Sequence, residues 1–269
     1  MKSEKEFTIR SYRATDRGAV RRLCCQTGFL GDPIDPVYQD HELFADFLTS
    51  YYTDKEPESS FVLEIEGEIR GYLLGSRRPL WNQLYSFRQN IRLFLRAIWR
   101  YPRYDARSRR FIRWMISHGW REVPAAPRRT PHFHINLLPD ARKMSTTRAL
   151  MSAYLSYLYR SGEKHVYGQI ATFQNRRGEK MFERYGFKVL NRAEITKYKA
   201  YYPESVYLST VIKTLETAEP LSVDIRSRSD DLHFHSALAR FDQSLPAEIV
   251  WDEISIRDAN VSARGCYGK

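Results

Sequence analysis

Cysteine is scarce in this chain: Cys24, Cys25 and Cys266 are the only three among its 269 residues. Adjacent cysteines rarely bridge each other and the spacing matches no zinc motif, so neither a disulfide scaffold nor a cysteine-based metal site is expected. No apolar run reaches the roughly 18 residues of a membrane-spanning helix. The charged residues 2–6 lack the apolar stretch of a signal peptide. We therefore expect a cytoplasmic protein with no transmembrane segment.

One long segment contains no lysine and almost no acidic residues. Between Arg77 and Arg129 there are fourteen arginines, no lysine, and only Asp105 and Glu122 as acids. The whole chain carries a formal net charge of +11, so the remainder is close to neutral. A local charge of this kind concerns partners more than the fold.

Hydrophobic residues are plentiful enough for a buried core. They make up 42% of the chain and aromatic residues 14%, which excludes extensive disorder. Alternating and helical patterns predict an α/β domain over residues 1–218 and a C-terminal extension over 219–269. Strands are expected at 7–12, 61–65, 69–74, 132–138, 166–171, 187–198 and 206–215, and helices at about 17–28, 43–48, 146–160 and 176–185.

The arginine-rich segment, at about residues 80–131, is predicted to be a helical insert between the third and fourth strands. Leu84, Phe87, Ile91, Leu95 and Ile98 recur at three- and four-residue steps, while arginines recur every four residues along another face. A second helix is expected over 106–118. The simplest interpretation is a helical pair whose apolar residues pack on the domain and cover a substrate cleft. An acidic substrate or partner, nucleic acid and a membrane surface are the alternatives.

Three local sequences carry a family resemblance. The first is residues 133–139, a strand that ends at Pro139. The second is the loop 142–147, and the third is residues 175–187, which end in Gly186-Phe187. In this order they resemble the fourth strand, the phosphate loop and the final helix of the GNAT superfamily of N-acetyltransferases. The likeness covers about residues 7–78 and 132–213.

The resemblance implies a GNAT fold, which is a mixed central sheet flanked by helices. It also implies an enzyme that transfers an acetyl group from acetyl-CoA, or an acyl group from another acyl-CoA, to an amine. A coenzyme diphosphate suits the amide N–H groups and the dipole of a helix N-terminus. Lys143, Ser145 and Thr147 stand where glycines are usual, and the hydroxyls of Ser145 and Thr146 would cap the helix or donate to phosphate. The implied cofactor-binding residues are Leu137, Leu138, Arg142, Lys143, Met144, Ser145, Thr146, Thr147 and Asn175.

Catalysis in this family needs a base for the amine and an acid for the departing thiolate. His132, His134 and Asn136 alternate and share one strand face, and His134 is the candidate base because imidazole titrates near neutral pH. Polar residues that merely fill space beside the strand are the alternative. Phe182 stands where many members have the acidic tyrosine, so Tyr185 is the candidate acid, with simple packing as its alternative.

Other functions stay open at this point. The missing loop glycines and Phe182 favour a degenerate GNAT-fold module that binds a ligand or partner without catalysis. The basic insert favours nucleic-acid binding. Two His-x-His pairs, at 132–134 and 233–235, lack further ligands at fixed spacing, so no metal site is expected. Cys24 and Cys25 are interpreted as buried structural thiols. The acceptor amine and a homodimer are left undecided.

Overall fold

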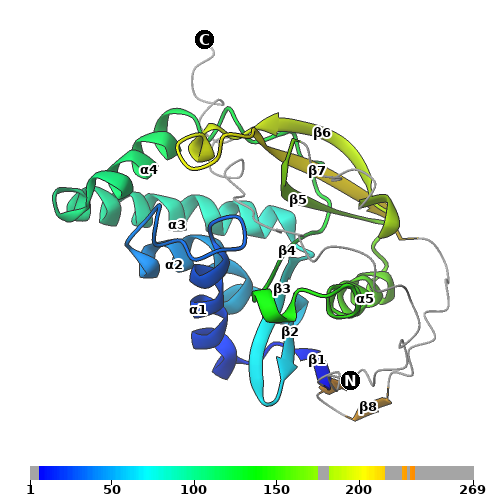
Figure 1. Ribbon diagram of the computed structural model, residues 1–269. Helices are drawn as coiled ribbons and strands as arrows, with labels where there is room; N and C mark the ends of the chain where they lie inside the picture. Colours follow the sequence, from blue (N-terminus) through cyan, green and yellow to red (C-terminus); the bar gives the residue numbers. More distant parts are fainter. Residues whose placement is uncertain (1–5, 175–181, 216–225, 229–230, 234–269) are drawn as a thin grey trace.

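The computed structural model describes residues 6–174, 182–215, 226–228 and 231–233, and a seven-stranded sheet lies at its centre (Figure 1). The strand order is β1-β2-β3-β4-β5-β7-β6; β4 and β5 are parallel, and the other neighbouring strands are antiparallel. The predicted mixed α/β sheet is confirmed. The strands are β1 (Phe7–Ser11), β2 (Ser60–Ile65), β3 (Glu68–Ser76), β4 (His132–Leu137), β5 (His165–Phe173), β6 (Lys188–Glu194) and β7 (Val206–Thr214), with β8 (Arg226–Arg228) and β9 (Asp231–His233) paired separately.

Helices cover both faces of this sheet. They are α1 (Arg17–Thr27), α2 (His41–Lys55), α3 (Pro79–Arg100), α4 (Ala106–Ser117) and α5 (Met144–Arg160). α1 and α2 lie on one side of the sheet and α5 on the other (Figure 1). Among the described residues, no helix is both long and apolar enough to cross a membrane.

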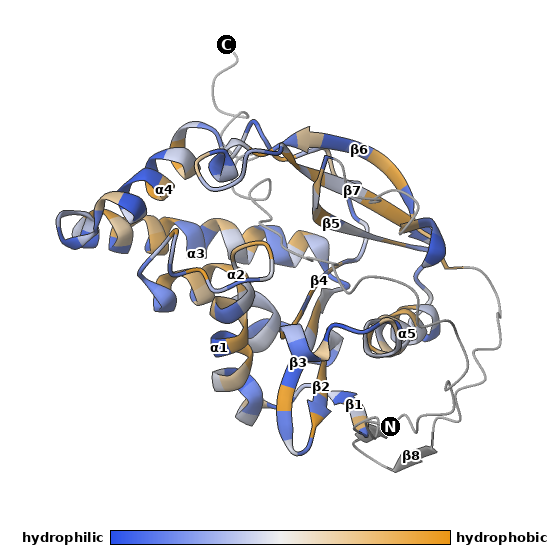
Figure 2. Ribbon diagram, in the orientation of Figure 1, coloured by the Kyte–Doolittle hydropathy of each residue, from blue (hydrophilic) through white to orange (hydrophobic). Residues whose placement is uncertain are grey.

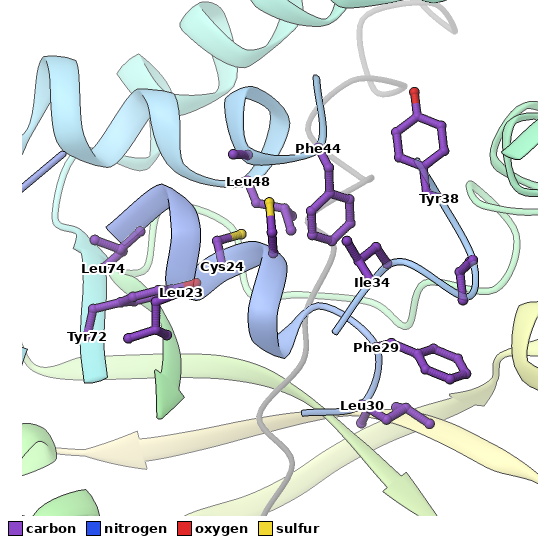
Figure 3. Close-up of a cluster of buried hydrophobic side chains, with 14 of the residues drawn as sticks. Leu23, Cys24, Phe29, Leu30, Ile34, Tyr38, Phe44, Leu48, Tyr72 and Leu74 are labelled. Carbon is purple, nitrogen blue, oxygen red and sulfur yellow. The ribbon is translucent and has the colours of Figure 1, made fainter. Parts of the chain in front are cut away.

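Each sheet face has its own hydrophobic core. The first core joins α1, α2 and the loop between them to β3, as Figure 3 shows for Leu23, Cys24 and Tyr72. The second joins α5 to the opposite face through residues such as Leu150 and Phe187. Cys24 and Cys25 are buried in the first core, as the sequence predicts, and burial raises the pKa of Cys25 to about 11. A thiol of this kind is structural and not nucleophilic at neutral pH.

Several predicted boundaries differ from the structure; the helix expected at 43–48, for example, spans His41–Lys55. Two of the differences have a clear local cause. α5 begins at Met144 rather than Thr146, because the Thr146 hydroxyl accepts from the Lys143 amide at 3.2 Å and so makes Lys143 the N-cap. β6 ends at Glu194 rather than continuing to Tyr198. There, the Glu122 carboxylate accepts hydrogen bonds from the amide and hydroxyl of Thr196 and holds the chain in a 3₁₀ turn.

The interpretation of the apolar stripe on α3 as a packing surface is wrong. Leu84, Ile91, Leu95 and Ile98 are exposed, together with Trp81 and Trp99, and Phe87 is half-buried. The buried residues of α3 are instead Asn82, Leu93 and Ala97, and Arg96 pairs with Asp46 of α2 at 3.1 Å. Helical periodicity correctly predicts that the apolar residues share one face of α3. It does not predict whether that face packs on the rest of the protein or is exposed to solvent.

A buried carboxylate fixes the junction of α2, β3 and α3. Glu56 is 1% exposed and its two oxygens accept four hydrogen bonds. The donors are the hydroxyls of Tyr51, Ser59 and Ser76, at 2.7, 2.8 and 2.9 Å, and the Arg77 amide at 2.5 Å. Buried charge is tolerated when it is hydrogen-bonded in this way. Glu56 therefore orients the chain as it leaves β3 and enters α3.

We predict that Glu56→Gln lowers the free energy of unfolding by about 2–4 kcal/mol, because the amide nitrogen would face donors instead of accepting from them. Urea denaturation measures the change. Glu58→Gln is the matched control, since Glu58 only pairs with Arg78 at 2.9 Å on the surface, where ion pairs contribute about 0–1 kcal/mol. Equal effects of both substitutions would contradict the role given to Glu56.

Candidate functional site

β4 and β5 pair over a short distance and then separate. Their parallel register contains only His132 with Tyr167 and Phe133 with Gly168, at the start of both strands. β4 then continues to Leu137 and β5 to Phe173 without pairing to each other. Backbone N–H and C=O groups along a strand edge need partners. The separation therefore leaves two strand edges inside the sheet that can receive an extended ligand.

The N-terminus of α5 follows directly after β4. An α-helix leaves its first N–H groups without an acceptor of its own, here those of Met144, Ser145 and Thr146. The N-cap Lys143 forms no side-chain cap, since an ammonium group only donates. Lys143 and Met144 are exposed and Ser145 is half-buried. The helix therefore presents uncapped amides and a nearby lysine at the end of the separated strands.

The hydroxyl groups near this helix start differ in their environment. Thr146 and Thr147 are buried. The Thr146 hydroxyl lies 2.6 Å from the Ala141 carbonyl and 2.9 Å from that of Lys143, in addition to its bond from the Lys143 amide. The expected donation from Thr146 to a phosphate is thus replaced by local backbone bonds. Ser145 is the hydroxyl that remains beside the uncapped amides.

Arg142 connects β4 to the loop between α1 and α2. Its Nε donates to the Leu137 carbonyl at 2.9 Å and its Nη2 donates to the Gly31 carbonyl. Gly31 has a φ of +92°, and a Cβ there would lie 2.8 Å from the Arg142 guanidinium. Only glycine combines this backbone conformation with such a close approach. Arg142 thus positions the loop beside the strand end.

The amide of Leu138 is also engaged, because it donates to the Arg70 carbonyl at 2.9 Å. This bond extends the β3–β4 pairing by one residue beyond Leu137. Asn175 lies outside the described residues. Among the predicted cofactor-binding residues, the structure thus gathers Leu137, Leu138 and residues 142–147 at one corner of the sheet.

The alternating polar residues of β4 do share one face, and they are buried there. His134 is 3% exposed and its Nε2 lies 3.0 Å from the Tyr72 hydroxyl, with the two rings stacked. The Asn136 amide nitrogen lies 3.0 Å from the same hydroxyl and 3.3 Å from His134 Nε2. The Asn136 NH₂ group only donates, so Nε2 is the acceptor in this contact.

His132, two residues earlier on the same face of β4, lies in a similar environment. Its Nε2 is 3.0 Å from the Tyr52 hydroxyl and 3.1 Å from the Asn82 amide nitrogen. On the opposite side of the strand, the Tyr154 hydroxyl donates to the His132 carbonyl at 2.8 Å. Tyr154 lies so close to β3 that a Cβ at Gly75 would be 2.2 Å from its ring. His132 is held by packing on both faces.

The polar partners Tyr52, Tyr72 and Asn82 were not identified from the sequence. Tyr72 belongs to an apolar strand and Asn82 to an arginine-rich helix, so their composition gives no sign of a site. The antiparallel register places Tyr72 opposite Asn136. A correct prediction of the β3–β4 register would have identified Tyr72 as a neighbour of Asn136.

Tyr185 and Phe182 lie in the second core, on the other side of the sheet from His134. Phe182 is fully buried and has no proton to give. The Tyr185 hydroxyl, in contrast, lies 3.0 Å from Met144 Sδ at the start of α5. Burial raises the pKa of Tyr185, so the hydroxyl keeps its proton at neutral pH. The two candidate catalytic residues therefore lie on opposite faces of the sheet.

Comparison with known proteins gives structural matches. No protein-family model matches the chain. The solved structure of SsHAT shares 26% sequence identity with this chain, and the match has a TM-score of 0.54. The aligned region covers 78% of this chain and 98% of the SsHAT chain. An N-acetyltransferase from Staphylococcus aureus Mu50 is 14% identical, with 78% and 99% covered and a TM-score of 0.47. The acetyltransferase yncA from Salmonella typhimurium, solved with acetyl-CoA, is 14% identical, with 79% and 96% covered and a TM-score of 0.44.

The sheet order, the separated parallel pair and the helix that starts at its end agree with the motifs found in the sequence. The similarity to SsHAT and this mixed sheet flanked by helices are consistent with the GNAT fold.

Proposed function

We propose that the chain is an acetyl-CoA-dependent N-acetyltransferase. The observation that carries the proposal is the separation of β4 from β5 directly beside the uncapped N-terminus of α5. An acyl-CoA would supply an activated acyl thioester, which an amine attacks. The chain would bind the extended arm along the strand edges and the diphosphate at the helix start.

The residues present fit a diphosphate despite the missing glycines. The amides of Met144, Ser145 and Thr146 open a helix of 17 residues, and the positive end of its dipole favours an anion. Lys143, whose side chain is exposed, adds a positive charge at the same end. A bound diphosphate would therefore meet three N–H donors, one ammonium group and the Ser145 hydroxyl.

We predict that Ser145→Glu weakens acetyl-CoA binding on the order of tenfold or more, because a carboxylate at the helix start repels the diphosphate. An acid in the first turn favours the helix itself, so folding is preserved. Ser145→Gln is the matched control, nearly equal in size and uncharged. Calorimetric titration measures the affinities. Binding that is equal in both variants would contradict a diphosphate site at α5.

His134 is proposed as the base that removes the proton from the acceptor ammonium group, directly or through water. The Tyr72 hydroxyl lies 3.0 Å and the Asn136 amide nitrogen 3.3 Å from its Nε2, and imidazole is the side chain that most often serves as a general base. Tyr72 and Asn136 would position the ring. Proton removal at this strand face would accompany attack of the amine in the gap between β4 and β5.

We predict that His134→Gln lowers kcat/KM by about a hundredfold or more. Coenzyme release, measured across a panel of primary amines, reports the effect. His165→Gln, at an exposed histidine at the start of β5, is expected to keep the wild-type kcat/KM. A variant that is less stable but keeps its kcat/KM per folded molecule would limit His134 to a structural role.

Tyr185 is proposed as the acid that protonates the departing thiolate. We predict that Tyr185→Phe lowers kcat by about a hundredfold with acetyl-CoA affinity unchanged. If the hydroxyl only packs against Met144 at the diphosphate end, the same variant will change the affinity and leave kcat intact. Tyr198→Phe, at a buried tyrosine of the first core, is the control for loss of a hydroxyl. Steady-state kinetics and calorimetry separate the two results.

A further inference from the structure

α3 presents its apolar face to solvent. Trp81 is 67% exposed, Leu95 60% and Trp99 68%, and Leu84 and Ile91 lie on the same face between them. Figure 2 shows hydrophobic and hydrophilic residues alternating along this helix. A contiguous exposed apolar surface of this length is uncommon in a monomer and marks a contact surface. We call this surface the α3 outer face; it comprises Leu80, Trp81, Leu84, Ile91, Phe94, Leu95, Ile98 and Trp99.

Ion pairs on the inner side of α3 hold it in this orientation. Arg96 pairs with Asp46 of α2 at 3.1 Å and Arg100 with Asp40 at 2.7 Å. Although burial opposes it, hydrogen bonds from Tyr104 and Arg100 lower the pKa of Asp40, so that the carboxylate stays charged. Ion pairs together with the buried Leu93 and Ala97 therefore fix the inner side, and the exposed apolar side remains for another partner.

The charge around the outer face selects the kind of partner. Arg88 and Arg92 are exposed on α3 beside the apolar residues. The neighbouring α4 adds exposed Arg107, Arg110 and Arg113. A second copy of the chain would bring the same positive charge and repel it.

The two acidic residues between Arg77 and Arg129 are bound within the protein, and of the exposed arginines named above only Arg107 is paired with one of them. Asp105 caps α4 by accepting from the Ser108 amide at 2.8 Å and pairs with Arg107 at 3.2 Å. Glu122 accepts from the Trp114 indole and the Thr196 amide. The surface is therefore apolar along its centre and cationic along its flank. A partner that complements this surface has an apolar interior and an anionic surface.

We propose that α3 binds the surface of an anionic lipid bilayer, lying in the plane of the interface. Its outer face would enter the boundary between headgroups and acyl chains, as amphipathic helices with a cationic flank do. Trp81 and Trp99, near the two ends of the 22-residue helix, have the amphipathic rings that favour this depth. Arginine suits phosphodiester groups because its guanidinium donates to two oxygens at once. The inference does not depend on the acetyltransferase activity.

The test is co-sedimentation of the full-length chain with vesicles of phosphatidylcholine alone or of equimolar phosphatidylcholine and phosphatidylserine. We expect binding to the anionic vesicles, weakened by salt, with a blue shift of tryptophan fluorescence. Leu84→Gln/Ile91→Gln/Leu95→Gln should lower the partition coefficient by about a hundredfold or more. Arg88→Gln/Arg92→Gln should lower it roughly thirtyfold, since each cationic side chain near an anionic membrane contributes about fivefold.

Matched controls remove similar groups elsewhere on the exposed surface. Tyr159→Gln/Leu190→Gln and Arg160→Gln/Lys188→Gln should bind like the wild type, and all these variants should keep the wild-type melting temperature because the substituted residues are exposed.

Several results would overturn the proposal. One is the absence of vesicle binding; another is binding that the apolar triple variant leaves unchanged, which indicates general electrostatic attraction. A wild-type dimer in light scattering that the triple variant converts to a monomer would assign the outer face to a second copy. Salt-sensitive binding to a mixed oligonucleotide, with no binding to vesicles, would assign it to nucleic acid.

Discussion

The parallel pairing of β4 with β5 is the constraint on which the candidate site depends. Two parallel strands in one sheet normally continue side by side and satisfy each other's backbone groups. Here the pairing stops after two residue pairs, although both strands continue. β4 keeps its register with β3, and β5 keeps its register with β7, so each strand remains firmly held on its outer side. The opening is therefore part of a rigid sheet.

Both faces of that sheet are covered, and this explains the chemistry of the residues beside the opening. A polar side chain under α1 and α2 must find partners there, and His134, Tyr72 and Asn136 supply them to one another. On the other face, the second core brings Tyr185 to Met144 at the start of α5. Close packing thus holds the candidate base and acid in place before a substrate binds.

The arginines act in two different ways. Arg142, Arg96 and Arg100 bind carbonyls or carboxylates of the protein itself and position a loop or a helix. Arg88 and Arg92 lie exposed beside an apolar surface. A count of positive charges in the sequence cannot separate these roles, because the partner of each arginine comes from a distant segment. Arg96, for example, is 50 residues from Asp46.

The sequence by itself determined the strands, most helices, the mixed sheet and the order of the GNAT motifs, because alternation, helical spacing and glycine turns are local properties of the chain. It also placed His134 and Asn136 on one strand face and Cys24 in the core. Only the tertiary structure decided that Arg142 and Thr146 bind backbone carbonyls, that Tyr185 reaches Met144, and that the apolar side of α3 faces solvent. Each of these depends on which distant segment lies opposite, and periodicity defines a face without naming its neighbour.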